Sequence, residues 1–173
     1  MVSMEQRAPT IEPLESMATS LDLSIGTSSL GSWIVDTGNR FAVIELESRK
    51  ALAAVKPYQE EIARISDSLD LVGYYLFTRD AGRDDRIATT RMFAPRYGIA
   101  EEAATGMAAG PLAGLLFERF GVGPSVVIEQ GALMPEPSPS ALHVRLDLED
   151  GKPVRLFAGG RAHIERRVAL EAS

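Results

Sequence analysis

The segment from Thr105 to Phe120, TGMAAGPLAGLLFERF, consists almost entirely of small and apolar residues. A helix on a protein surface carries a polar face, and this run has almost none. It therefore predicts a helix that is buried on all sides. Gly121 follows and is a favourable residue for ending a helix. Because such a helix must be covered in every direction, the rest of the chain has to wrap around it.

Strand-like segments lie on both sides of this helix in the sequence. SWIVDTGNRFAVIEL predicts a hairpin that turns at residues 37–39, and residues 73–79, 86–93 and 126–130 are rich in β-branched and aromatic residues. The stretch LHVRLDLEDGKPVRLFAGG alternates, and Asp150-Gly151 supplies the turn of a second hairpin. One face of its first strand holds Leu142, Val144, Leu146 and Leu148. The fold class expected is α+β, with a curved, barrel-like antiparallel sheet of six or more strands around one central buried helix.

Two short helices are expected outside the sheet. Ser48 can cap a helix over RKALAAV, and Pro57 separates it from a second helix over YQEEIARIS, because proline lacks a backbone donor. Residues 1–32 combine a short helix expected over 11–21 with a Ser/Gly/Thr-rich stretch. They are interpreted as a connector, and residues 33–173 as one domain.

The composition argues against several classes of function. Eighteen basic and twenty-four acidic residues give a net charge of −6, which does not support general nucleic-acid binding. The chain has no cysteine and two separated histidines, His143 and His163, so no metal site is expected. No apolar run approaches the length of about 18 residues that a membrane span needs, and the start, MVSMEQRAPT, lacks the apolar segment of a signal peptide. A cytoplasmic protein without a membrane partner is expected.

The most informative segment for function is Arg91 to Gly110. Two adjacent carboxylates, Glu101 and Glu102, precede Thr105 and Gly106 at the start of the predicted helix. Unsatisfied N–H groups and partial positive charge make a helix start a plausible seat for an anion, and a glycine lets a ligand approach closely. Alternatively, Thr105 is only an N-cap, and the small residues only allow close packing. Likewise, the two glutamates either serve acid/base chemistry or form a solvated pair.

The order of residues in this segment resembles a signature of the phenazine-biosynthesis PhzF-like isomerases, relatives of diaminopimelate epimerase. That signature reads R-x-F-A-P-x-x-G-I-x-E-D-P-A-T-G-S-A. The segments VDTGN (35–39), IEQGALMPEPS (128–138) and VRLFAGGRAHI (154–164) resemble further family segments in the same order. The resemblance covers about residues 11–164. The matching signature residues are Arg91, Phe93, Ala94, Pro95, Gly98, Ile99, Glu101, Ala104, Thr105, Gly106 and Ala108.

The resemblance implies one half of a two-domain architecture. Family members fold as two similar domains, each a curved antiparallel sheet around a central helix, with the active site in the cleft between them. This chain resembles the C-terminal domain. The family's cofactor-free proton transfers use a glutamate of an S-E-T-type motif in the N-terminal domain, opposite the acidic and hydroxyl groups of the signature loop. No S-E-T occurs in this chain.

The resemblance also assigns candidate residues. Glu102, where the family has Asp, is the candidate catalytic acid/base, and Glu102, Thr105, Gly106, Met107 and Ala108 are the candidate substrate-binding residues. Met107 stands where the family has Ser and the epimerases have Cys, and a thioether has no proton to donate. The remaining departures from the family pattern are Ala103 for Pro, Pro135 for Gly and Glu136 for Arg.

Two functions of different class follow. In the first, the chain is a half-size PhzF-like isomerase or epimerase domain that acts on a small carboxylate-bearing metabolite without a cofactor. It would be completed as a homodimer, or as a heterodimer with an N-terminal-type PhzF-like half. In the second, the chain is a catalytically inactive relative that serves as a binding or structural module. Glu102 and the Thr105-Gly106 seat favour the first function, whereas Met107 and the missing S-E-T glutamate favour the second.

Overall fold

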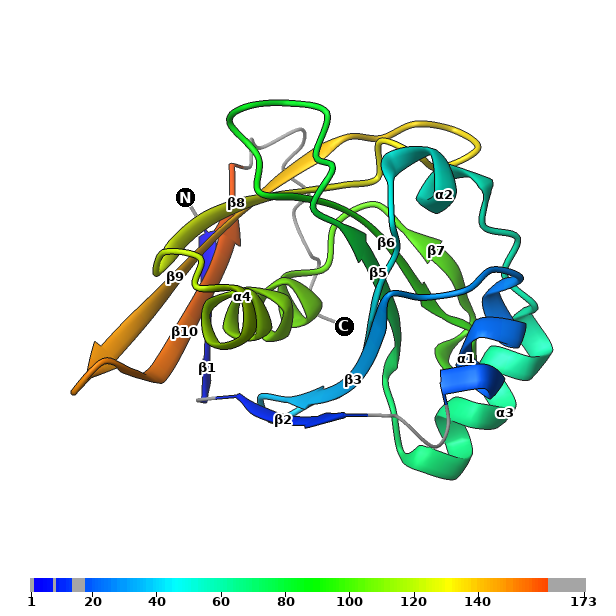
Figure 1. The fold of residues 1–173 in the computed structure, drawn as a ribbon, viewed down its shortest axis with the longest axis horizontal. Coiled ribbons are helices and arrows are strands. Elements are labelled where there is room, and N and C mark those ends of the chain that lie inside the picture. Colours follow the sequence, from blue (N-terminus) through cyan, green and yellow to red (C-terminus); the bar gives the residue numbers. More distant parts are fainter. Residues whose placement is uncertain (1, 8, 14–17, 162–173) are drawn as a thin grey trace, which may run out of the picture.

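The computed structural model describes residues 2–7, 9–13 and 18–161. His163 and the end of the segment 154–164 lie outside these ranges. The described residues form ten strands in one strongly curled sheet (Figure 1). The order along the sheet is β1-β10-β9-β8-β6-β5-β4-β3-β2, and β7 pairs with β6. The strands are β1 (Val2–Arg7), β2 (Thr10–Pro13), β3 (Gly31–Asp36), β4 (Arg40–Glu45), β5 (Gly73–Thr78), β6 (Ala88–Ala94), β7 (Ile99–Glu102), β8 (Ser125–Gln130), β9 (Ser140–Glu149) and β10 (Lys152–Gly160).

Helix α4 (Gly106–Phe120) lies inside the curve of the sheet, as the apolar run predicts (Figure 1). It ends at Gly121, which has a φ of +65°. Pro111 lies beyond the first turn of α4 and removes the N–H that would otherwise bond to the Met107 carbonyl. The α+β fold class, a curled sheet around a central buried helix, is confirmed. None of the described helices is long and apolar enough to cross a membrane.

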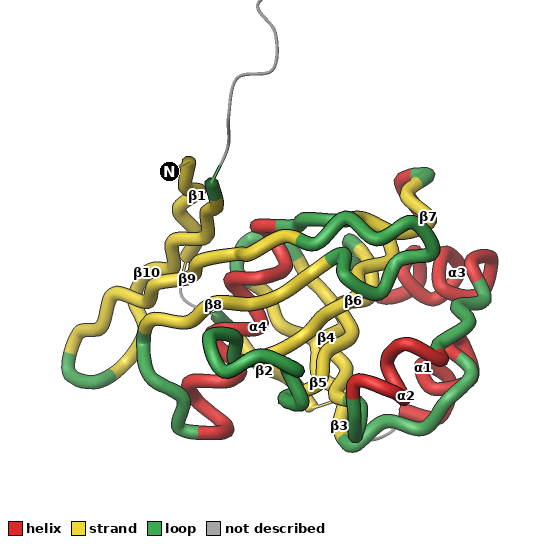
Figure 2. The backbone as a smooth tube through the Cα atoms, turned by 90° about the horizontal axis from the view of Figure 1, so that it is seen from above, coloured by secondary structure: helices red, strands yellow, loops and turns green. Residues whose placement is uncertain are grey.

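Three further helices cover the outer face of the sheet on one side: α1 (Ala18–Ile25), α2 (Arg49–Ala54) and α3 (Gln59–Leu69). Figure 2 shows them together at the end of the molecule opposite β1, β9 and β10. Strand β5 is buried on both faces: Tyr75 and Phe77 face the core around α4, whereas Tyr74 and Leu76 face the core under the outer helices. The sheet therefore separates two hydrophobic cores.

The locally encoded elements agree with the sequence predictions. The turn between β3 and β4 contains Gly38 at a φ of +107°, and the turn between β9 and β10 contains Asp150 and Gly151, both at positive φ. The Ser48 hydroxyl accepts a hydrogen bond from the Ala51 N–H and caps α2. Leu148, near the tip of the second hairpin, is 38% exposed, because that tip extends past the end of the core.

The sheet is mixed, which corrects the expectation of a wholly antiparallel one. Strands β4 and β5 run parallel, as do β6 and β8, and the other neighbouring pairs are antiparallel. Parallel neighbours need a long crossover connection instead of a tight turn. Helices α2 and α3 lie in the first connection, and α4 lies in the second.

The first 32 residues also differ from the expected connector. They supply β1 and β2, which occupy opposite ends of the strand order. A helix is expected over residues 11–21, but residues 11–13 belong to β2, and of the described residues in this range only 18–21 are helical, as the start of α1. The end of β1 and the residue before β2 pass close to α4: a Cβ on Gly110 would lie 1.8 Å from Gln6 Oε1, and one on Gly114 would lie 2.7 Å from Pro9 Cγ. A short strand that ends in proline is tolerated at a sheet edge, and its pattern is hard to separate from a loop.

Candidate active site

The two adjacent glutamates of β7 point in different directions, because side chains alternate across a strand. Glu101 forms a two-point ion pair with Arg91, in which Nε–Oε1 and Nη2–Oε2 are both 2.8 Å apart. Nη1 of Arg91 donates to the carbonyls of Leu52 and Val55 at the end of α2. Both partners of the ion pair are nearly buried. Glu101 therefore fastens β7 to β6 and α2, and the two glutamates do not form the solvated pair that is one alternative from the sequence.

Glu102 lies beside the start of α4. The hydroxyl of Thr105 donates to Glu102 Oε2 over 2.7 Å. Thr105 occupies the N-cap position, but its side chain makes no bond to the helix N–H groups. The hydroxyl thus serves the carboxylate and not the helix, which argues against the interpretation of Thr105 as an N-cap only.

The side-chain amide of Gln130 forms hydrogen bonds to the same loop. It is fully buried, and its Nε2 donates to the Glu102 carbonyl over 2.7 Å and to Thr105 Oγ1 over 2.9 Å. Its Oε1 accepts from the Thr105 N–H over 3.2 Å and from the Tyr75 hydroxyl over 3.0 Å. Gln130 belongs to the quoted segment IEQGALMPEPS, but the sequence gives it no role, because its partners lie far away along the chain.

Tyr75 is buried beneath the loop. Burial raises the pKa of the Tyr75 hydroxyl, and this effect outweighs the lowering by a hydrogen bond from Thr90. The hydroxyl therefore stays protonated at neutral pH and acts as a donor to Gln130.

The N–H groups at the start of α4 are partly committed. The Thr105 N–H is bonded to Gln130, and the Ala108 N–H donates to the Thr105 carbonyl over 3.2 Å. Within the predicted seat, the N–H groups of Gly106 and Met107 are therefore the ones that can meet an anion. Both residues are partly accessible, whereas Ala108 is fully buried.

The turn between β3 and β4 borders this seat. Asn39 Nδ2 lies 3.7 Å from Met107 Sδ as a donor to the thioether. On the other side, Gln6 Nε2 lies 3.4 Å from the Gly106 carbonyl, and Thr37 Oγ1 lies 3.5 Å from Gln6 Oε1. The segment 35–39 and the signature loop, which are separated in sequence, therefore meet at the start of α4.

Two cavities of about 570 and 500 Å³ border β9 and the loop 79–87, and the smaller one reaches Ala104, the residue before Thr105. Both are lined by Asp85, Arg86 and His143, and neither is lined by Glu102 or Thr105. In the part of the chain that the structure covers, no group of three or more histidine and carboxylate side chains can hold a metal ion.

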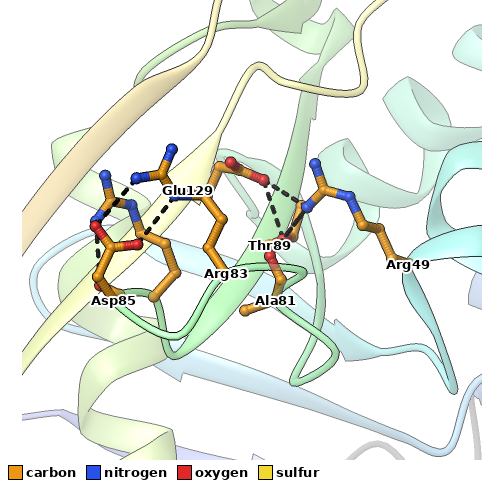
Figure 3. Close-up of polar contacts among 7 residues, drawn as sticks. Arg49, Ala81, Arg83, Asp85, Thr89 and Glu129 are labelled. Carbon is orange, nitrogen blue, oxygen red and sulfur yellow. Dashed lines mark hydrogen bonds and ion pairs between the residues drawn. The ribbon is translucent and has the colours of Figure 1, made fainter.

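A polar network fixes the loop 79–87 in place (Figure 3). Arg49 Nη1 donates to Glu129, Thr89 and the Ala81 carbonyl, and Asp85 pairs with Arg83. The network lies on the opposite face of the sheet from α4, since Glu129 and Gln130 alternate along β8. It thus supports the fold and is separate from the seat.

The chain is similar to a known protein family along nearly its whole length. Residues 2–166 match the family model PhzC-PhzF, phenazine biosynthesis-like protein. Trans-2,3-dihydro-3-hydroxyanthranilate isomerase of Pseudomonas aeruginosa is 33% identical over 177 residues, covering 99% of this chain and 54% of that protein. The enzyme of the same name from Pseudomonas chlororaphis is 36% identical over 175 residues, with the same coverage. The chain thus spans about half the length of the curated relatives it matches.

Solved structures show the same fold. A PhzF-family phenazine biosynthesis protein of Bacillus anthracis superimposes with a TM-score of 0.74 at 21% identity, over 91% of this chain and 56% of that one. A predicted epimerase from Pseudomonas aeruginosa gives a TM-score of 0.68 at 22% identity, over 95% and 58%. At these identities the structures show only the fold. The family model and the isomerases, however, match nearly the whole chain, and this chain belongs to the PhzF-like family of phenazine biosynthesis-like proteins.

Proposed function

We propose that this chain is one half of a PhzF-like isomerase or epimerase that moves a proton on a small carboxylate-bearing metabolite, without a cofactor. A second domain or subunit completes the site. The observation that carries this proposal is the Glu102 carboxylate, held 2.7 Å from the Thr105 hydroxyl beside the start of α4. This arrangement sets an acid/base group next to an anion seat.

The seat and the Glu102 carboxylate have different roles in the proposed reaction. The N–H groups of Gly106 and Met107 hold the substrate carboxylate, helped by the positive end of the α4 dipole. Glu102 takes a proton from, or returns it to, a carbon near that carboxylate. A second acid/base group, which the family resemblance places in an S-E-T motif of the other half, performs the opposite transfer. Together they move one proton between two positions, so that atoms and charge balance.

The substrate class comes from the relatives. They are named for isomerising trans-2,3-dihydro-3-hydroxyanthranilate, and an anthranilate carries a carboxylate on its ring. We propose a substrate of the same class for this chain, a small cyclic or unsaturated carboxylic acid.

A non-catalytic binding module is the second candidate function. The observation that favours it is Met107, whose sulfur contacts Asn39 at the start of α4. A thioether does not donate a proton, so a hydroxyl-assisted step cannot occur at this position. Such a module would keep the anion seat and lose the chemistry.

Deuterium exchange from solvent tests the proposal. The purified chain, alone and with an S-E-T-bearing N-terminal-type half, is incubated in D2O with amino acids, hydroxy acids, unsaturated diacids and trans-2,3-dihydro-3-hydroxyanthranilate. We expect incorporation only with both halves, because two groups must be positioned for the transfer. The Glu102→Gln variant should lose it. Glu118→Gln, an exposed position near the other end of α4, should keep it.

Two outcomes would contradict the proposal. Ligand binding without exchange by the completed pair would favour the binding module. Exchange by the chain alone that Glu102→Gln abolishes would show that no S-E-T-bearing half is needed.

A further inference from the structure

The buried amide of Gln130 has a consequence for the chemistry of Glu102, and the argument rests on the proposed function. We infer that Gln130 is a positioning residue: acting through Thr105, it fixes the Glu102 carboxylate and determines which of its oxygens faces the substrate. Gln130 is fully buried and touches Glu102 only through the backbone carbonyl. Its effect on the carboxylate therefore passes through the Thr105 hydroxyl.

The orientation of the Gln130 amide follows from its four partners. Two donors, the Tyr75 hydroxyl and the Thr105 N–H, converge on one end of the side chain, which must be the carbonyl oxygen. The other end lies 2.7 Å from the Glu102 carbonyl and 2.9 Å from Thr105 Oγ1, and must be the NH2 group. The Thr105 N–H can only donate and the Glu102 carbonyl can only accept, because both are backbone groups. In the flipped amide, the NH2 group would face the Thr105 N–H and the oxygen would face the Glu102 carbonyl, and neither pair could form a hydrogen bond.

The orientation of Gln130 then sets the direction of the Thr105 hydroxyl. A hydroxyl carries one proton, and Thr105 Oγ1 already accepts from Gln130 Nε2. Its own proton therefore points to Glu102 Oε2, 2.7 Å away. The chain of donors runs one way, from Gln130 through Thr105 to the carboxylate.

This direction has a chemical consequence. The Thr105 proton engages one lone pair of Glu102 Oε2, so we expect Oε1 to be the oxygen that exchanges a proton with the substrate. A general base works only when its oxygen is held within hydrogen-bond reach of the reacting carbon, and a freely rotating glutamate would spend little time there. Gln130 thus contributes preorganisation and touches no reacting atom.

Side-chain NMR of the 173-residue chain tests the inference without any assay of activity. Three-bond couplings should show a single side-chain rotamer for Glu102 in the wild type. In Gln130→Met and Thr105→Val, they should average toward the values of a free glutamate. Thr105→Ser, which keeps the hydroxyl, should restore the wild-type couplings. Gln59→Met is the matched control, because Gln59 Nε2 donates to the Ala100 carbonyl of the same strand from α3, and its loss should leave Glu102 unchanged.

Rates of deuterium exchange by the completed pair give the second readout. Gln130→Met should lower the exchange rate about tenfold, because the loss of one hydrogen bond that positions the base costs about that factor. Substrate affinity should stay within about twofold, because the N–H groups of the seat are unchanged. A fixed Glu102 rotamer in Gln130→Met would overturn the inference, and so would an unchanged exchange rate. If the pair shows no exchange at all but the couplings behave as expected, the proposed function fails and the positioning of Glu102 stands. If Gln130→Met does not fold, the Glu102 couplings and the exchange rates of Thr105→Val and Thr105→Ser provide the same test.

Discussion

Gly131, the residue after Gln130, holds the segment 131–138 tightly against the loop before α4. Its φ is +80°, and a Cβ there would lie 2.2 Å from the Ser138 carbonyl oxygen and 2.8 Å from that of Ala103. Both atoms are backbone, so neither can move away cheaply. We expect Gly131→Ala to lower the free energy of unfolding by about 3 kcal/mol, the sum of a left-handed backbone and a steric clash. Urea denaturation measures this loss. Gly151→Ala is the control, because Gly151 has a similar φ of +75° with open space around it and should lose only about 1 kcal/mol. Equal losses in the two variants would show that the clash is relieved.

The residues of the candidate site were predictable from the sequence only in part. Glu102 and Thr105 precede the apolar run of α4, so a helix start with a nearby carboxylate could be predicted from local pattern alone. The separate roles of Glu101 and Glu102 follow from strand alternation, but only once β7 is known to be a strand. Gln130 could not be found in this way, because it lies 25 residues from Thr105 and 55 from Tyr75.

At the scale of elements, the ion pair between Arg7 and Asp36 fastens edge strand β1 to the turn that begins after β3. Arg7 Nη2 lies 2.7 Å from Asp36 Oδ1. Partial burial alone would raise the pKa of the Asp36 carboxyl. Hydrogen bonds from Arg7 and the Gly38 N–H outweigh it, with the charges of Arg7 and Arg40, and hold the pKa below its ordinary value. A lowered folded-state pKa contributes stability above the unfolded pKa of about 3.9, and this is lost as the pH falls through the folded pKa.

We therefore expect Asp36→Asn to be less stable than the wild type at pH 6, by at most about 1 kcal/mol, the usual limit for an exposed pair. The difference should shrink as the pH falls below about 4. Denaturation curves at several pH values measure it. Asp84→Asn, in the exposed part of the loop 79–87, reports the effect of removing one negative charge elsewhere. A difference that grows toward low pH would contradict the assignment.

The elements predicted correctly are those encoded by neighbouring residues. Local residues alone determine three such features: the apolar run of α4, the turn at Asp150-Gly151 and the cap at Ser48. Strands β1 and β2 were missed because an edge strand is defined by its partners: β1 pairs with β10, at the far end of the chain, and β2 with β3. The parallel pairs were missed because strand direction depends on crossover connections, which no local pattern reveals.

On the scale of the whole molecule, the curled sheet already covers most of α4, and the start of the helix is the part that a partner would complete. Gly106 and Met107 are partly accessible there, next to Asn39, with the buried side chains of Gln6 and Thr37 behind them. The two-domain architecture that the resemblance implies sets a sister domain against this face, and two similar domains can pack about a pseudo-twofold axis. A second copy of the chain can occupy the same place in an isologous dimer.

We expect the purified chain to form a dimer, and light scattering over a range of concentrations measures its mass. Met107→Glu should shift the equilibrium toward the monomer, because it brings two like charges together across the twofold and places each of them in a partly desolvated contact. Leu23→Glu is the matched control, since Leu23 is 67% exposed on α1, on the outer side of the sheet. It should leave the mass unchanged. A monomer at every concentration would contradict the dimer. Completion by a different domain would then be the remaining possibility, and light scattering would detect it as a one-to-one complex after an S-E-T-bearing half is added. If Leu23→Glu dissociates the dimer while Met107→Glu does not, the interface lies on the outer helices, and the start of α4 is not the face that a second copy covers.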